Sequence, residues 1–176
     1  MNSETVMEQE QSGLDKVLSL RSSAEIVNVD EPTVKLVVFE LDGEYFAFPG
    51  EAIAEIMPAT DVYFVPGCPP SLEGVINVRG DIESVIRLAE LLGKPAADPA
   101  STSSILRGQG GGMHSGIRVD RVVDVLDVVQ SAIQVPPATL PEHLRRIVSG
   151  LMRYQDTPVV ILDLDRLFED YQRGLG

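Results

Sequence analysis

A short turn sequence, Asn77-Val78-Arg79-Gly80, carries the side chain best suited to specific recognition in this chain. Asparagine and glycine suit a tight turn because both tolerate a positive φ. A turn has no need of a guanidinium, however, and an arginine held on a rigid hairpin can form a forked pair of hydrogen bonds with a carboxylate. The turn therefore predicts an interaction site that includes Arg79.

The residues that could support catalysis lack the neighbours that such chemistry requires. His114 and His143 are not in a metal-ligand spacing such as His-Glu-x-x-His, and we expect both to be exposed, in a loop or at a helix end. Cys68 has no histidine close in sequence to act as its base, and we expect a loop or semi-buried thiol there. We therefore expect a protein that is not an enzyme.

Two further motifs have structural interpretations. The run 108–112 (Gly-Gln-Gly-Gly-Gly) is followed by Met113 and His114, whereas a phosphate loop would continue into Gly-Lys-Ser/Thr, so we expect a flexible hairpin loop. Asp163 and Asp165 lie at a predicted strand end and helix start, where acidic residues cap backbone N–H groups. We expect no cofactor and no metal, although a small metal-dependent hydrolase built on these two aspartates stays open as an alternative.

Composition limits the possible partners. The 176 residues carry 14 Lys and Arg against 27 Asp and Glu, a formal net charge of −13. Such a chain repels phosphate backbones and anionic lipid, which argues against nucleic-acid binding and membrane association. The single cysteine excludes an internal disulfide, and no apolar run approaches the roughly 20 residues of a membrane span. We expect a cytoplasmic protein without direct membrane insertion.

Hydrophobic periodicity predicts an all-β protein with short helices. Aliphatic residues alternate in short runs separated by turn signals, a pattern typical of small barrels. We expect a helical turn or short strand over 51–57, an extended proline loop over 65–70 and helices over 87–92 and 164–172. The expected strands are 34–41, 44–48, 73–79, 81–86, 103–107, 113–120, 122–128, 147–154 and 158–163. Residues 1–32 are predicted to be a mobile arm, with a docking helix as the alternative.

Residues 33–172 resemble the CheW family, the adaptor proteins of bacterial chemosensory arrays. The segment 72–92 is similar to the family's Gly-Val-x-Asn-Leu-Arg-Gly hairpin with its following strand and helix. Four further elements of the family are matched in the family's order, by segments 34–48, 54–56, 116–125, and 149–151 together with 159–167. The resemblance implies two small five-stranded β-barrels packed together around a shared core.

The resemblance also implies a function. A CheW-like adaptor would couple the cytoplasmic tips of chemoreceptors to the regulatory domain of the histidine kinase CheA, at receptor arrays on the inner membrane. A CheW-like module in a non-flagellar pathway, for pilus or second-messenger control, is the alternative. The residues that we expect to bind partners are Glu55, Ile56, Val65, Asn77, Arg79 and Gly80.

One strand departs from the family pattern. Where the family has Ile-Val-Pro-Val-Ile-Asp, this chain has Glu83 in place of an apolar residue, Ser84 in place of proline and Arg87 in place of aspartate. Because Arg87 reverses a charge at the start of a predicted helix, these changes indicate an accessory or divergent array.

Overall fold

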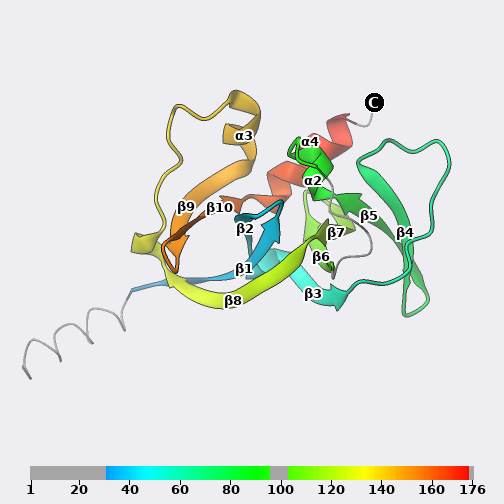
Figure 1. Ribbon diagram of the computed structural model, residues 1–176, viewed down its shortest axis with the longest axis horizontal. Coiled ribbons are helices and arrows are strands. Elements are labelled where there is room, and N and C mark those ends of the chain that lie inside the picture. The colour runs from blue at the N-terminus through cyan, green and yellow to red at the C-terminus, as the bar shows by residue number, and fades with distance from the viewer. Residues whose placement is uncertain (1–30, 96–102, 175–176) are drawn as a thin grey trace, which may run out of the picture. The chain divides into compact units, whose positions relative to one another are not determined.

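Two five-stranded sheets make up the computed structural model, which describes residues 31–95 and 103–174 (Figure 1). The first sheet has the strand order β8-β1-β2-β10-β9. Its strands are β1 (Thr33–Leu41), β2 (Glu44–Pro49), β8 (Arg121–Val129), β9 (Val148–Tyr154) and β10 (Thr157–Leu162). Strands β2 and β10 run parallel, which joins an early hairpin to the closing hairpin of the chain.

The second sheet repeats this plan with the order β3-β6-β7-β5-β4. Its strands are β3 (Ile53–Pro58), β4 (Leu72–Val78), β5 (Asp81–Arg87), β6 (Ser104–Gly110) and β7 (Met113–Val119). A parallel pair, β5 with β7, again links two antiparallel hairpins. The predicted all-β architecture of two five-stranded units packed together is thus confirmed.

Four two-residue turns close the hairpins and set their register. Each has a positive φ at both central residues: Asp42-Gly43 (50° and 75°), Arg79-Gly80 (53° and 94°), Gly111-Gly112 (55° and 74°) and Gln155-Asp156 (47° and 65°). Turns of this kind match the right-handed twist of the flanking strands. A fixed turn fixes which face of each strand every side chain occupies.

Both sheets contribute to one shared core. Phe39 and Phe48 of the first sheet stack with ring centroids 5.0 Å apart, and they belong to the same buried cluster as Ile86 and Leu106 of the second sheet. A smaller core lies within the second sheet alone and contains Ile76, Val78, Val85 and Ile105. This small core positions the candidate site described below.

Short helices complete the fold. They are η1 (Gly50–Ala52), α2 (Leu88–Leu91), η2 (Gln130–Ala132), α3 (Glu142–Ile147) and α4 (Leu164–Gly174). Helix α4 buries Leu164, Leu167, Phe168 and Tyr171 in the shared core. As predicted, Asp163 caps this helix, because its Oδ1 accepts a hydrogen bond from Arg166 N at 3.1 Å. The expected helices are confirmed, whereas α3 has no counterpart in the sequence interpretation.

The glycine run was expected to be a flexible loop, and that expectation is wrong for its first three residues. Strand β6 continues through Gly110, and only 111–112 form the turn. A Cβ on Gly108 would lie 2.8 Å from Leu164 Cδ2, and one on Gly110 would lie 2.7 Å from Asp165 Oδ1. These glycines therefore let the first turn of α4 lie directly on the hairpin.

The predicted arm, residues 1–32, lies almost wholly outside the described residues. Strand β1 begins at Thr33, and the described residues from Val34 onward form one compact unit. Within the described ranges, the helices are all too short or too polar to cross a membrane.

Candidate interaction site

Arg79 occupies a backbone conformation that arginine seldom adopts. Its φ of 53° lies in the left-handed region, which costs a side-chain-bearing residue roughly 1–2 kcal/mol relative to ordinary backbone. The turn is closed by Asn77, whose Oδ1 accepts a hydrogen bond from Gly80 N at 2.8 Å. A turn alone would favour asparagine or glycine at position 79, so the unusual backbone makes Arg79 a candidate for a functional role.

The Arg79 guanidinium forks onto Glu55 of strand β3. Its Nη2 donates to Glu55 Oε1 at 2.8 Å and its Nη1 to Oε2 at 3.2 Å. The arginine side chain is 72% exposed, whereas the glutamate is 30% exposed. The fork leaves the Nε–H and one hydrogen on each Nη open for a partner.

The pair continues inward through two residues that sequence reasoning missed as site residues. Arg107 of β6 lies directly opposite Glu55 in the β3–β6 register, and its Nη1 donates to Glu55 Oε2 at 3.2 Å. Arg107 also forks onto Glu83 of β5, with Nε donating to Oε2 at 3.0 Å and Nη2 to Oε1. We call Arg79, Glu55, Arg107 and Glu83 the charge ladder.

The contacts within the charge ladder shift the pKa values of two of its members. The forked hydrogen bonds from Arg79, aided by Arg107, lower the pKa of the Glu55 carboxyl, while partial burial opposes the shift. The hydrogen bonds to Glu83 raise the pKa of Arg107 above its usual value. Both pKa shifts favour the charged forms of Glu55 and Arg107, which strengthens the contact between them.

A second ionic group lies on the same face of the second sheet. Arg118 of β7 forks onto Glu73, with Nε donating to Oε2 at 2.9 Å and Nη2 to Oε1 at 2.6 Å. Its Nη1 donates to Ser103 Oγ at 2.6 Å. Arg118 lies opposite Ile105 of the small core, and Arg107 lies two residues further along β6. Both ionic groups therefore lie on the face of the sheet that carries the small core.

Each departure from the family pattern in β5 has a partner within the chain. Glu83 pairs with Arg107, and Arg87 lies 3.9 Å from Glu73. The Ser84 hydroxyl hydrogen-bonds the buried Ser115 hydroxyl at 2.8 Å. The departures are therefore compensated locally.

Some apolar residues near the proline loop are exposed, and others belong to the core. Ile53 packs on the shared core and Val62 on the small core. Ile56 is 42% exposed and Phe64 is 75% exposed. Val65 is half-buried in the loop between β3 and β4. On the Arg79 hairpin itself, Ile82 is 75% exposed, although the sequence analysis did not single it out.

The remaining candidates have structural surroundings. Asp165 Oδ1 accepts a hydrogen bond from Gly111 N at 2.9 Å, as befits a residue that secures the hairpin. No cluster of three or more His, Cys, Asp or Glu side chains suited to a metal ion occurs within 31–95 and 103–174. His143 is exposed in α3, as expected near a helix end, whereas His114 is exposed on strand β7 rather than in a loop. Cys68 is half-buried in the proline loop.

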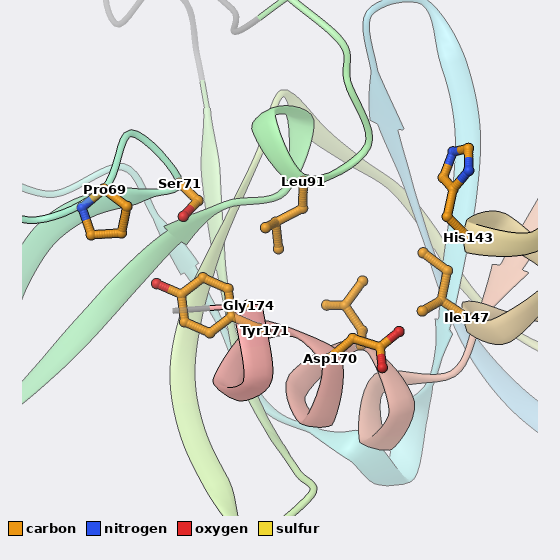
Figure 2. A pocket seen from close by; sticks show the side chains of 9 residues that line it. Pro69, Ser71, Leu91, His143, Ile147, Asp170, Tyr171 and Gly174 are labelled. Carbon is orange, nitrogen blue, oxygen red and sulfur yellow. The ribbon is translucent and has the colours of Figure 1, made fainter. Parts of the chain in front are cut away.

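A cavity of about 250 Å³ lies where the helices approach the proline loop (Figure 2). Leu91, Ile147, Leu167 and Tyr171 supply its apolar walls, and His143 and Asp170 lie on its α3 and α4 side. Burial raises the pKa of the Tyr171 hydroxyl. The cavity involves none of the residues that the sequence analysis assigned to partner binding.

Known proteins share this fold and sequence pattern. The family model described as "CheW-like domain" matches residues 35–172. The chain is 29% identical over 136 residues to a probable chemotaxis protein CheW of Rhizobium etli, covering 77% of this chain and 88% of the relative. It is 28% identical to the chemotaxis protein CheW of Thermotoga maritima, with the same coverage. The crystal structure of the scaffolding protein TtCheW from Thermoanaerobacter tengcongensis superposes with a TM-score of 0.68 at 27% identity, covering 78% of this chain and 88% of that one.

Proposed function

Because the chain belongs to the CheW-like domain family and is a chemosensory scaffold, we propose that it couples chemoreceptor tips to the regulatory domain of the histidine kinase CheA. In this role it acts by binding alone, without catalytic chemistry of its own. It works in the cytoplasm, beside the receptor arrays of the inner membrane. The observation that supports this assignment most directly is the family match over 138 of the 176 residues, numbers 35–172.

The Arg79 hairpin is the docking surface that we propose for one of these partners. Arg79 presents open N–H donors at a strained turn, and Glu55 fixes the plane of its guanidinium. Ile82 on the same hairpin supplies exposed apolar area, and so does Ile56, which follows Glu55 in β3 with its side chain on the opposite face of the strand. Asn77 and Gly80 shape the turn, and Val65 lies in the adjoining loop. Such a surface suits a partner that presents a carboxylate next to apolar side chains.

Charge reversal at Arg79 tests this surface. We expect Arg79→Glu to weaken binding to the CheA regulatory domain or to a receptor cytoplasmic fragment by at least several-fold, measured by calorimetric titration. The melting temperature should hardly change, because exposed ion pairs contribute little to stability. Arg121→Glu is the matched control, since Arg121 is 53% exposed and pairs with Glu40 in the first sheet.

The reciprocal swap, Glu55→Arg with Arg79→Glu, separates two ways in which the pair could act. Recovered binding would mean that the pair matters through its mutual attraction, whereas continued loss would mean that Arg79 itself contacts a carboxylate of the partner. Wild-type affinity of Arg79→Glu for both partners, with an unchanged melting temperature, would refute the proposed docking surface.

A further inference from the structure

We propose that Glu83 and Arg107 are positioning residues for the Arg79 docking surface, acting on Arg79 through the Glu55 carboxylate. This inference rests on the proposed function and extends it to two residues that lie behind the surface. Glu83 is one of the departures from the family pattern, so this way of positioning Arg79 depends on a residue particular to this chain.

The geometry of the charge ladder carries the argument. Glu55 Oε2 is shared, because Arg79 Nη1 and Arg107 Nη1 both donate to it at 3.2 Å. Arg107 cannot rotate freely around this contact, since its Nε and Nη2 are held by the two oxygens of Glu83. The position of Glu55, and hence the plane of the Arg79 fork, is therefore set from the inner end of the ladder.

Exposure rises in order along the ladder. Glu83 is 14% exposed, Arg107 26%, Glu55 30% and Arg79 72%. The inner pair is anchored on β5 and β6, whose residues Val85 and Ile105 form part of the small core. An exposed arginine alone would lose much rotameric freedom on binding, whereas one already fixed loses less. The ladder thus extends order from the core to a solvent-exposed guanidinium.

The ladder also keeps each of its charges paired while Arg79 binds. Two guanidiniums alternate with two carboxylates, so its net charge is zero. Arg79 can receive a partner's carboxylate on its open N–H groups while its fork on Glu55 stays in place. Without Arg107, Glu55 would be held by Arg79 alone, and no contact from the inner strands would fix the position of the fork.

A purely structural role predicts something different. The ladder lies on the face of the sheet that carries the small core, and so does the pair of Arg118 with Glu73. If covering the core were the whole purpose, a leucine pair in place of either ion pair would have the same effect. Replacing a partly buried ion pair by apolar residues is often neutral or stabilising, which keeps both variants usable.

The test therefore compares Glu83→Leu/Arg107→Leu with Glu73→Leu/Arg118→Leu in the full chain. One readout is affinity for the CheA regulatory domain and for the receptor fragment. The other is the order parameter of the Arg79 Nε–H group, measured by ¹⁵N NMR relaxation in the free protein, which needs no partner. We expect the Glu83/Arg107 variant to lose Arg79 order and at least threefold in affinity, and the Glu73/Arg118 variant to retain both. Arg107→Lys keeps the charge without the fork, and it should lower Arg79 order in the same way.

Unchanged Arg79 order in both the Glu83/Arg107 variant and Arg107→Lys would overturn the inference, whatever the affinities. Equal losses in the Glu73/Arg118 variant would overturn it too, because they would show a general effect of core covering. Arg79→Ala made alone tests the surface separately. If Arg79→Ala binds both partners as the wild type does, the proposed docking surface fails, while the NMR result still decides whether Glu83 and Arg107 position Arg79.

Discussion

Gly108→Ala should destabilise the protein, although alanine for glycine in a strand is ordinarily favourable. The added Cβ would lie 2.8 Å from Leu164 Cδ2 and 3.0 Å from Ile117 Cδ1. Favourable carbon–carbon contacts need about 3.5–4.0 Å. Leu164 is only 2% exposed and Ile117 is fully buried, so neither methyl group can move into solvent.

The magnitude follows from these contacts. Overpacking of a filled core costs about 1–3 kcal/mol, and the backbone entropy gained by replacing glycine returns about 0.5–1 kcal/mol. The middle of each range gives a net loss of about 1 kcal/mol, with an upper limit of about 2.5 kcal/mol, and these correspond to roughly 4 °C and 10 °C in melting temperature for a unit of this size.

Urea denaturation followed by circular dichroism measures this loss as a lower midpoint at constant slope. Gln109→Ala is the matched control, because Gln109 is exposed on the same strand and should change stability by less than about 0.5 kcal/mol. Adding Leu164→Val to Gly108→Ala should show favourable coupling, since it relieves the closest contact. If Gly108→Ala is as stable as the wild type, the view that the glycine run allows α4 to pack closely on the β6–β7 hairpin is wrong.

Two further outcomes follow from the structure. A chain starting at Pro32 should keep cooperative melting, because β1 begins at Thr33, whereas one starting at Val38 should not fold; loss of cooperativity in the longer chain would contradict this. In a ¹³C NMR titration, the Glu55 carboxyl should titrate at lower pH in the wild type than in Arg79→Ala, because the Arg79 fork lowers its pKa. Because the pKa of Glu55 is lowered in the folded protein, its contribution to folding stability is complete above the ordinary pKa of about 4.3 and is lost as the pH falls through the folded pKa. Equal titration midpoints in the wild type and in Arg79→Ala would show that the fork does not form in solution.

Local sequence signals predicted most of the fold. Asp42-Gly43 and Asn77-Val78-Arg79-Gly80 mark hairpins because the residue types needed at positive φ are few. Asp163 marked the start of α4 because a side-chain oxygen must satisfy a free backbone N–H there. Helix α3 escaped prediction because only Ile147 of its six residues is buried, so it carries almost no apolar periodicity. The glycine run was misinterpreted because close approach to α4 involves a helix more than 50 residues away, which no local pattern reveals.

The candidate site was predictable only at its exposed end. Arg79 stood out because its residue type is unusual for its turn, and the family pattern supplied Glu55. Arg107 gave no local signal, and nothing in the sequence paired it with Glu83, since the two meet across strands β6 and β5, which are separated by β7 in the sheet. The usable clue was Glu83 itself. It places a charge at a position of β5 that is apolar in the family pattern, and such a charge needs an opposite charge nearby.

The pairing of Glu83 with Arg107 suggests how an acidic protein could bind a partner's carboxylate through Arg79. With a net charge of −13, the chain as a whole repels a carboxylate. That repulsion is screened beyond a Debye length of about 8 Å at physiological ionic strength, whereas the donors of Arg79 act only at hydrogen-bonding distance. A partner's carboxylate therefore gains from Arg79 only if the guanidinium is already correctly placed, because charge-assisted forked bonds tolerate little misalignment. In the proposed docking, the placement of Arg79 is therefore the selective step, and the inner residues of the ladder are proposed to determine it.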